Sequence, residues 1–172
     1  MKTEVTLQVA TFATPCGPFS VAVNETGAVV ATAFGDLAAL RSRLKPICHL
    51  ISDKPGLVAA VKKELTEYFA GKRSRFSVPL AAQGTDFQNR VWTALVAIPF
   101  GETRSYGQLA AELGNPGASR AVGRANATNP ICLLMPCHRV IGSDGSLTGF
   151  AFGETIKRQL LAHEGAFPVS RT

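Results

Sequence analysis

Hydrophobic and polar residues alternate through the first third of the chain, which is the pattern of half-buried β-strands. In residues 5–9 every second residue is Val or Leu, and the residues between them are polar. Two further apolar segments, 19–23 and 28–34, flank the four residues Asn-Glu-Thr-Gly at 24–27. A short connection that ends in Gly between two apolar runs predicts a β-hairpin. We therefore expect a small antiparallel sheet.

Two helices are predicted to follow these strands. Asp36 is a suitable N-cap for a helix that carries apolar residues through Leu44. A second helix should begin near Pro55 and end at Gly71. Its apolar residues repeat on one face: Leu57, Val58, Val61, Leu65, Tyr68 and Phe69. The basic segment 72–75 suits a solvated turn or linker, and 81–85 separates an N-terminal α/β domain, 1–85, from a C-terminal domain, 86–172.

The C-terminal part changes from alternation to helical periods. Helices are predicted from Asp86 to Pro99, from Ser105 to Leu113, over 118–127, and around 156–161 with an end at Gly165. The second and third are joined by Gly-Asn-Pro-Gly, and this arrangement is typical of a helix-turn-helix, whose second helix enters a DNA groove. The fold class is therefore α+β, with a sheet domain before a helical one.

On the helix at 118–127, the core side would hold Ala121, Val122 and Ala125. The exposed side would carry Ser119, Arg120, Gly123 and Arg124. A hairpin around 142–146 could serve as the wing of a winged helix-turn-helix. Helix pairs joined by a Gly turn also occur in ordinary helical cores, and Arg120 alone suits a solvated surface. The pattern by itself leaves both interpretations open.

Composition excludes several classes of protein. The 172 residues are 46% hydrophobic and 17% charged, which is enough apolar material for a core and too much for a disordered chain. The longest apolar runs are a few residues, far below the roughly 20 that a membrane helix needs. The first residues do not resemble a signal peptide, so we expect a cytoplasmic protein without a membrane partner.

The net charge of +6 is informative only through its location. Residues 1–85 contribute +4 and residues 86–172 contribute +2, so the excess is spread thinly. Between Leu113 and Ser143, however, there is no acidic residue, and this window contains Arg120, Arg124 and Arg139. A phosphate backbone could approach this part of the chain without repulsion.

The cysteines do not form a recognisable framework. Cys16, Cys48, Cys132 and Cys137 contain no CxxC pair, so neither a disulfide scaffold nor a zinc site is expected. Cys132 lies within the apolar run 131–135 and suits the core. No metal ligand set is predicted.

Cys137 has the most suggestive neighbours. The apolar run 131–135 predicts a strand that delivers Pro136 and Cys137 to its end, and Pro suits the first turn of a helix. The N-H groups and dipole at a helix start favour a thiolate. His138 would point away from the sulfur on a continuing strand, so either the chain turns at Pro136 or a water connects the two side chains.

A catalytic histidine needs a third polar group that orients it. The candidates are Glu164, Glu154, Asp144 and Glu112. The alternative is a buried thiol beside a structural histidine, and the residues alone do not exclude it.

Longer motifs are more specific than the Cys137–His138 pair alone. Pro136-Cys137-His138-Arg139-Val140 is accompanied by Phe87-Gln88-x-x-Val91-Trp92-x-Ala94-Leu95, Ile98-Pro99-x-Gly101-x-Thr103-x-Ser105-Tyr106, Arg120-Ala121-Val122-Gly123, Asn129-Pro130 and Leu160-Leu161-x-x-Glu164-Gly165. This set resembles the O6-alkylguanine-DNA alkyltransferases, also called methylated-DNA–protein-cysteine methyltransferases, in order and spacing. The resemblance covers 86–165, and the N-terminal sheet is compatible with the ribonuclease-H-like domain that precedes the catalytic part in that family.

The resemblance implies a set of catalytic roles. Cys137 would accept a methyl or small alkyl group from O6 of guanine, or less efficiently from O4 of thymine, in one irreversible turnover without a cofactor. His138 would deprotonate Cys137 through a water, and Glu164 would hold the imidazole. Asn129 would brace the neighbouring turn, and Tyr106 would meet the flipped nucleotide and help to protonate the leaving guanine.

The resemblance also implies how DNA binds. Arg120 would fill the gap that the flipped base leaves in duplex DNA, with its helix in the minor groove beside Ser119, Gly123 and Arg124. The pocket for the base would comprise Met135, Val140, Ser143, Phe150 and Phe152, with Val140 and Ser143 reading the guanine edge through their backbone. Phe150 and Phe152 depart from the residues common in the family, and Phe152 puts tolerance of bulky alkyl groups in doubt.

Other functions remain to be weighed against this one. A non-catalytic alkyl-damage-binding protein, a winged-helix regulator and a Cys-His-Glu hydrolase would share parts of the pattern. We expect a monomer, and cooperative assembly on DNA stays open.

Overall fold

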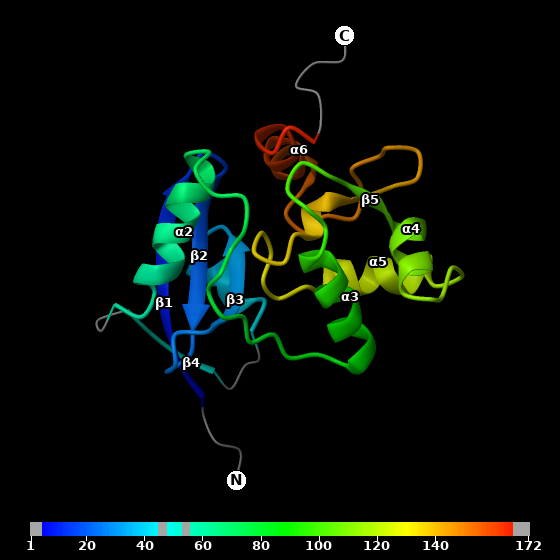
Figure 1. Cartoon of the computed structure of the whole chain (residues 1–172). Coiled ribbons are helices and arrows are strands. Elements are labelled where there is room, and N and C mark those ends of the chain that lie inside the picture. The colour runs from blue at the N-terminus through cyan, green and yellow to red at the C-terminus, as the bar shows by residue number, and fades with distance from the viewer. Residues whose placement is uncertain (1–4, 45–47, 53–55, 167–172) are drawn as a thin grey trace. The chain divides into compact units, whose positions relative to one another are not determined.

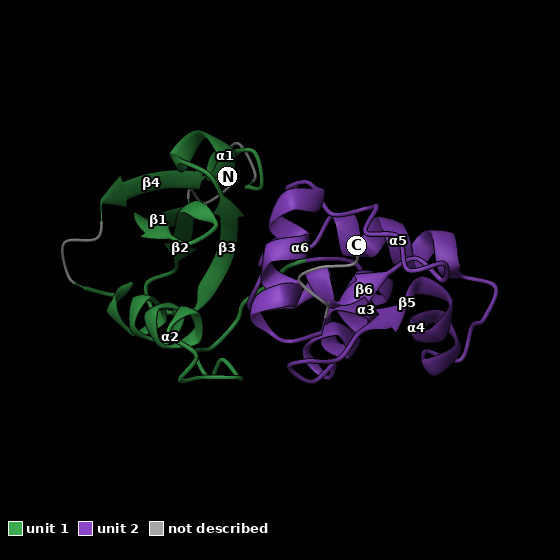
Figure 2. Cartoon of the chain, turned by 90° about the horizontal axis from the view of Figure 1, so that it is seen from above, with its two compact units in different colours: residues 1–83 green, residues 84–172 purple. Residues whose placement is uncertain are grey.

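The computed structural model describes residues 5–44, 48–52 and 56–166. The chain divides into two compact units, residues 1–83 and 84–172, which Figure 2 distinguishes by colour. The division lies inside the segment 81–85, where the composition changes. Within the described residues, no helix combines the length and the apolar character that crossing a membrane requires.

The first unit is built on a four-stranded sheet. Strands β1 (Val5–Thr14), β2 (Gly17–Val23) and β3 (Val29–Phe34) pair antiparallel, as the alternation predicted. A fourth strand, β4 (Cys48–Ser52), pairs parallel with β1 and gives the order β3-β2-β1-β4. The sequence analysis missed β4, because it is short, half-exposed and paired with a strand that is distant in sequence.

The core of this unit lies between the sheet and one helix. Phe19 of β2 and Phe34 of β3 meet edge to face at 4.9 Å, and both are buried. Helix α2 (Ala59–Phe69) buries Val61, Leu65 and Tyr68, and Figure 1 shows it lying along the sheet. Its predicted start at Pro55 lies outside the described residues.

Two other local predictions can be compared with the structure. Asp36 does cap α1 (Leu37–Arg41), because its carboxylate accepts a hydrogen bond from the Ala39 N-H at 3.1 Å. The helix ends at Arg41, earlier than Leu44, where the expected helix would have continued. The basic segment after α2 is held at Arg73, whose guanidinium lies 3.6 Å from the Glu64 carboxylate and 3.5 Å from that of Glu67.

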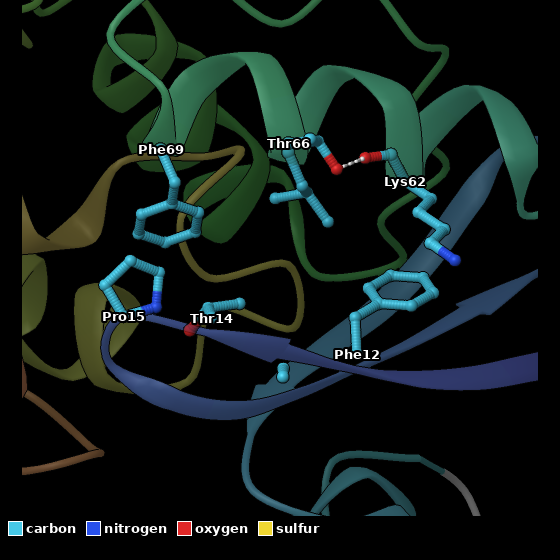
Figure 3. Close-up of a pocket in the computed structure, with 8 residues that line it drawn as sticks. Phe12, Thr14, Pro15, Lys62, Thr66 and Phe69 are labelled. Atoms are coloured by element: carbon cyan, nitrogen blue, oxygen red, sulfur yellow. Dashed lines mark hydrogen bonds between the residues drawn. The ribbon is translucent and has the colours of Figure 1, made fainter.

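A shallow pocket of about 220 Å³ lies between the end of β1 and α2. Figure 3 shows Phe12, Thr14 and Pro15 facing Lys62, Thr66 and Phe69. The Lys62 ammonium lies over the Phe12 ring, 5.7 Å from its centre. Apart from Lys62 and two threonines, the residues that line this pocket are apolar.

The second unit is helical. Its elements are α3 (Asp86–Val96), β5 (Arg104–Ser105), α4 (Tyr106–Glu112), α5 (Ser119–Ala127), the 3-10 helix η1 (Cys137–Arg139), β6 (Val140–Ile141) and α6 (Glu154–His163). Thr85 and Ser105 cap α3 and α4 through capping boxes with Gln88 and Gln108. The Trp92 indole of α3 donates to the Ala125 carbonyl of α5 at 2.8 Å, so the helices are joined by packing and by a buried hydrogen bond.

Helices α4 and α5 form the predicted helix-turn-helix, but two details differ. Ala121 is exposed, whereas Asn126 takes a buried position on α5. The segment 142–146 is a turn closed by a hydrogen bond from Gly142 N-H to the Ser146 carbonyl, without flanking antiparallel strands. The short strand that precedes it, β6, pairs parallel with β5 instead.

Candidate active site

The segment before Cys137 is a turn and not the strand that its apolar residues predicted. The Asn129 side chain accepts from the Ile131 N-H at 2.9 Å and donates to the Met135 carbonyl at 2.8 Å, so it spans the turn. Leu133 has φ +74°, the left-handed region that a residue with a side chain seldom adopts. The sequence does not reveal this turn, because residues 131–135 are buried and a buried turn is as apolar as a buried strand.

The chain then turns at Pro136 into η1. The Cys137 N-H donates to the Met135 carbonyl at 2.7 Å, and the Arg139 N-H donates to the Pro136 carbonyl at 3.0 Å. A single 3-10 turn has almost no dipole, and the Cys137 N-H already has a partner. The Cys137 N-H is therefore not free to stabilise a thiolate, and the single turn adds little to the stabilisation expected from a helix start.

Glu164 is the acidic residue that meets His138. Its Oε2 atom lies 2.8 Å from His138 Nε2, and neither side chain is exposed to solvent. The other three candidates, Glu112, Asp144 and Glu154, are exposed. Glu164 follows α6 directly and is brought from 26 residues away in sequence.

Arg139 completes the same cluster. Its Nε and Nη2 atoms donate to the two Glu164 oxygens at 2.8 and 3.0 Å, and its Nη1 atom donates to the Ile98 carbonyl. The sequence analysis grouped Arg139 with the arginines that could face phosphate. It is 6% exposed and bound on all sides, so that grouping is wrong.

The contacts within this cluster influence the protonation of Glu164 and His138. Burial by itself would raise the pKa of Glu164, but hydrogen bonds from His138 and Arg139 and the positive charge of Arg139 outweigh it and lower the pKa to about 2. Burial lowers the pKa of His138, and the Arg139 and Lys157 charges add to that effect against the opposing Glu164. The close His138–Glu164 contact is therefore a hydrogen bond from a neutral imidazole to a carboxylate.

The tautomer of His138 follows from this pairing. A carboxylate can only accept, so Nε2 carries the hydrogen and Nδ1 carries the lone pair. Nδ1 is buried and has no hydrogen-bonding partner among the described residues. The arrangement leaves a proton-accepting nitrogen on the residue next to Cys137, which itself is 4% exposed.

A buried lysine was missed by the sequence analysis. Lys157 of α6 is inaccessible to solvent, and its Nζ atom donates to the Val140 carbonyl at 2.6 Å. Burial lowers the pKa of Lys157 to about 8, although the Cys137 and Glu154 charges oppose that shift. The signal was available, because Lys157 shares the buried face of α6 with Leu160, Leu161 and Glu164 at helical spacing.

Tyr106 lies at the start of α4 against the loop after β6. Its hydroxyl donates to the Thr148 carbonyl at 3.0 Å. Burial and the nearby Cys137 charge raise the pKa of Tyr106, and a hydrogen bond with Asn126 partly offsets them. Gly149 has φ +87°, and a Cβ atom there would lie 2.5 Å from the tyrosine hydroxyl. The tyrosine position therefore depends on a glycine that the sequence analysis did not single out.

A groove of about 490 Å³ opens between the two helices of the helix-turn-helix and this loop. It is lined by Tyr106, Ser119, Arg120, Gly123, Arg124, Ala127, Thr148 and Gly149. All five residues predicted to contact DNA, Tyr106 included, are among them, and none of the lining residues is acidic. Arg120 and Arg124 are exposed, and Ser119 and Gly123 are half-buried.

The residues predicted to hold the base are only partly brought together. Met135 and Val140 are buried on either side of η1, and Phe150 contacts Phe152 edge to face at 5.7 Å. Ser143 is exposed in the turn 142–146 and does not line the groove.

Both units are similar to known proteins. Residues 86–166 match the family described as "6-O-methylguanine DNA methyltransferase, DNA binding domain", and residues 7–82 match its "ribonuclease-like domain". A methylated-DNA–protein-cysteine methyltransferase of Mycobacterium tuberculosis (strain ATCC 25618 / H37Rv) is 46% identical over 154 residues, which cover 90% of each chain. The chain belongs to the 6-O-methylguanine DNA methyltransferase family.

Other relatives of this methyltransferase agree with the assignment. A methylated-DNA–protein-cysteine methyltransferase of Methanosarcina acetivorans is 57% identical over 104 residues, covering 60% of this chain and 67% of that one. A crystal structure of M. tuberculosis OGT in complex with DNA is 40% identical and has a TM-score of 0.80, covering 94% of each chain. The match to that structure includes both units.

The first prediction concerns acid stability of the methyltransferase. Glu164 has a pKa of about 2 when folded and an ordinary value near 4.5 when unfolded, so the unfolded chain binds the extra proton. The stability that Glu164 contributes is complete above about pH 4.5 and is lost as the pH falls towards 2. In urea unfolding at pH 5 and pH 3, we expect wild type to lose about 2 kcal/mol more than Glu164→Gln.

Glu112→Gln is the matched control, because Glu112 is an exposed partner of Arg104. It should keep the wild-type dependence on pH. A Glu164→Gln variant that also kept it would contradict the assigned charge of Glu164.

The second prediction concerns Gly149. Gly149→Ala should lower the free energy of unfolding, because it combines a left-handed backbone with a clash against the Tyr106 hydroxyl. Gly145→Ala is the control, since Gly145 has φ +83° and open space around its Cβ position. We expect Gly149→Ala to be less stable than Gly145→Ala by about 1–2 kcal/mol in urea unfolding. Equal losses would show that the tyrosine contact imposes no constraint.

Proposed function

We propose that this protein repairs alkylated DNA by transferring a methyl or small alkyl group from O6 of guanine to the sulfur of Cys137. The observation that carries the proposal is the buried chain from Arg139 through Glu164 to His138, next to Cys137. Family membership and similarity to proteins named for this activity support it. The reaction needs no cofactor in this scheme.

His138 acts as the general base. Its Nδ1 atom takes the thiol proton of Cys137 through a bridging water. With this water, the two adjacent side chains do not have to touch each other. Glu164 holds the Nε2–H tautomer and stabilises the imidazolium that forms, and Arg139 keeps Glu164 ionised. Asn129 holds the turn that presents Cys137. This scheme is supported by the contacts of Glu164 and by the Nδ1 atom without a protein partner.

The transfer is a displacement at an sp³ carbon. The thiolate forms the C–S bond while the C–O bond to guanine breaks, and the electron pair leaves on the base. Tyr106 supplies a proton towards that leaving base from its position near Cys137. The product is a thioether, and water does not readily displace a thiolate from an ordinary alkyl carbon. The protein therefore acts once, and alkyl groups on O4 of thymine would react by the same route less efficiently.

DNA is proposed to bind over α5 by its minor groove. Its target atom lies inside the base stack, so the nucleotide must flip outward at a cost of a few kcal/mol. Arg120 fills the gap in the stack, and Ser119, Gly123 and Arg124 contact the adjacent backbone. The acid-free groove lined by these residues supports this placement. We propose that one copy of the protein is sufficient.

The flipped base is proposed to meet Met135, Val140, Phe150 and Phe152. The backbone of Ser143, in the exposed turn 142–146, is proposed to read the guanine edge together with that of Val140. Cys137 itself disfavours a non-catalytic alkyl-damage-binding protein of the same shape, which would need no cysteine there. A winged-helix regulator is disfavoured by the run from Pro136 to Arg139 together with Glu164.

The third prediction tests this function directly. After incubation with a duplex that contains labelled O6-methylguanine, peptide mass analysis should find one methyl group per molecule, on Cys137. Cys137→Ser should take up no label, and Cys132→Ser should remain active if it folds. Label on Cys132, release of free methanol, or repeated turnover would each overturn the proposal.

The fourth prediction separates base extrusion from chemistry. Arg120→Ala should repair duplex DNA about tenfold more slowly or worse, while its reaction with free O6-methylguanine base stays within about twofold of wild type. Arg75→Ala, which changes an exposed arginine in the first unit, should leave both rates unchanged. Equal losses on both substrates would mean that Arg120 supports the fold.

A further inference from the structure

The surplus of positive charge on the first unit has no part in the mechanism above. Residues 1–85 contribute +4 of the net +6, whereas the proposed DNA site on α5 belongs to the second unit. A positively charged surface attracts the phosphate groups of nucleic acids, provided that nearby carboxylates do not neutralise its lysines and arginines. One side of helix α2 meets that condition.

The carboxylates and the ammonium groups of α2 have different surroundings. Glu64 and Glu67 both form ion pairs with Arg73, and Glu64 is buried. Lys62 and Lys63 are exposed, and among the described residues neither forms an ion pair with a carboxylate. The negative charges of the helix are thus taken up by an arginine, while two ammonium groups stay available to an anion.

Lys62 also lines the shallow pocket between the end of β1 and α2. In Figure 3 the rings of Phe12 and Phe69 lie at opposite ends of this pocket, and Lys62 lies over Phe12. Both rings are half-buried, so each keeps part of its surface in contact with solvent. The volume of about 220 Å³ is below the roughly 300–1,000 Å³ of pockets that enclose a whole small-molecule ligand. The pocket therefore has room for one flat ring.

The hydroxyl groups in the pocket are already engaged within the protein. Thr66 Oγ1 donates to the Lys62 carbonyl at 2.8 Å, and Thr14 Oγ1 donates to the Gly17 carbonyl at 2.6 Å. Among the side chains that line the pocket, only Lys62 still offers donors to a ligand. A ligand that suits this lining has an apolar face and a negative charge, and it needs few hydrogen bonds.

An unpaired nucleotide has this combination of properties. The flat face of its base stacks on aromatic side chains without hydrogen bonds, and its phosphate is an anion that a long lysine side chain can reach. In duplex DNA the neighbouring base pairs cover that face. A peptide with acidic side chains would bring backbone N-H and C=O groups as well, and the pocket has no partners for them.

We propose that the pocket between β1 and α2 is a second nucleic-acid site, in which an unpaired base stacks against Phe12 and Phe69 while Lys62 contacts its phosphate. The site takes single-stranded DNA without a preference for sequence, because every base has a face that can stack. It is independent of the chemistry at Cys137, and it shares no residue with the groove on α5.

The test first locates the bound strand by photocrosslinking. A short thymidine strand that carries 5-iododeoxyuridine is irradiated with the full chain, and the crosslinked peptides are identified by mass. We expect crosslinks to peptides that contain Phe12 or Phe69, in addition to any on α5. Cys137→Ser should give the same crosslinks, so failure of the proposed function would leave this result unaffected.

The affinity for the strand is then measured in a background of Arg120→Ala and Arg124→Ala, which weakens binding at α5. Phe69→Leu should raise the Kd about fivefold or more, because it removes a stacking ring. Lys62→Gln should make the affinity less sensitive to salt. The slope of log affinity against log salt concentration should become shallower by about 0.7, the contribution of one phosphate contact on a single strand.

Phe76→Leu and Arg75→Gln are the matched controls, because they remove a ring and a charge from the first unit outside the pocket. Both should keep the affinity and the salt dependence of the background protein. Thr66→Glu is a further variant in case Phe69→Leu impairs folding. Thr66 is exposed on α2, and a carboxylate there would repel the phosphate, so the Kd should again rise about fivefold or more.

Four results would each overturn the inference. Crosslinks confined to the second unit would show that the pocket holds no base, and so would an unchanged affinity in both Phe69→Leu and Thr66→Glu. An equal loss of affinity for a duplex of the same length would mean that this face attracts phosphate without stacking a base. Tighter binding of a polyglutamate peptide than of the strand would assign the pocket to an acidic protein segment.

Discussion

The arrangement of the catalytic unit depends on one buried carboxylate. Glu164 accepts hydrogen bonds from His138 and from two nitrogens of Arg139, so residues at the end of α6 and in η1 are held together without access to water. A carboxylate buried with a single partner would cost several kcal/mol and would take up a proton. With Arg139 as a second partner it stays ionised, while burial and the Arg139 and Lys157 charges keep the imidazole neutral with Nδ1 open.

The second constraint is that α5 serves two surfaces at once. Its outer face carries Arg120 and Arg124 into an acid-free groove, while its inner face places Asn126 against the backbone of Cys137. The bond from Trp92 to the Ala125 carbonyl ties the same helix to α3. A helix that lines the groove on one side and contacts the Cys137 backbone on the other can couple the position of a ligand in the groove to the position of the sulfur.

Much of the fold was predictable because the determining signals are local. Strand alternation in residues 5–9, the Asp36 cap and the capping box at Ser105 act over a few residues, and the structure has all three. The errors lie where local and distant interactions compete. Residues 131–135 are as apolar as a strand, yet the Asn129 side chain and the conformation of Leu133 make them a turn. Strand β4 was missed because its partner is far away in sequence.

The sequence by itself determined the helices on either side of the Gly-Asn-Pro-Gly turn, the arginines on the exposed side of the second one, and the motif around Cys137 with its family resemblance. The family resemblance already indicated Glu164 as the partner of His138, and the structure has that contact. Only the tertiary structure decided that Arg139 is buried rather than free for phosphate, and that Lys157 and Asn126 point inward. The physical reason is that helix caps and hydrophobic periods depend on neighbours within one or two turns. The partner of a buried charge is instead chosen by which distant segments pack together, and a single sequence does not display that choice.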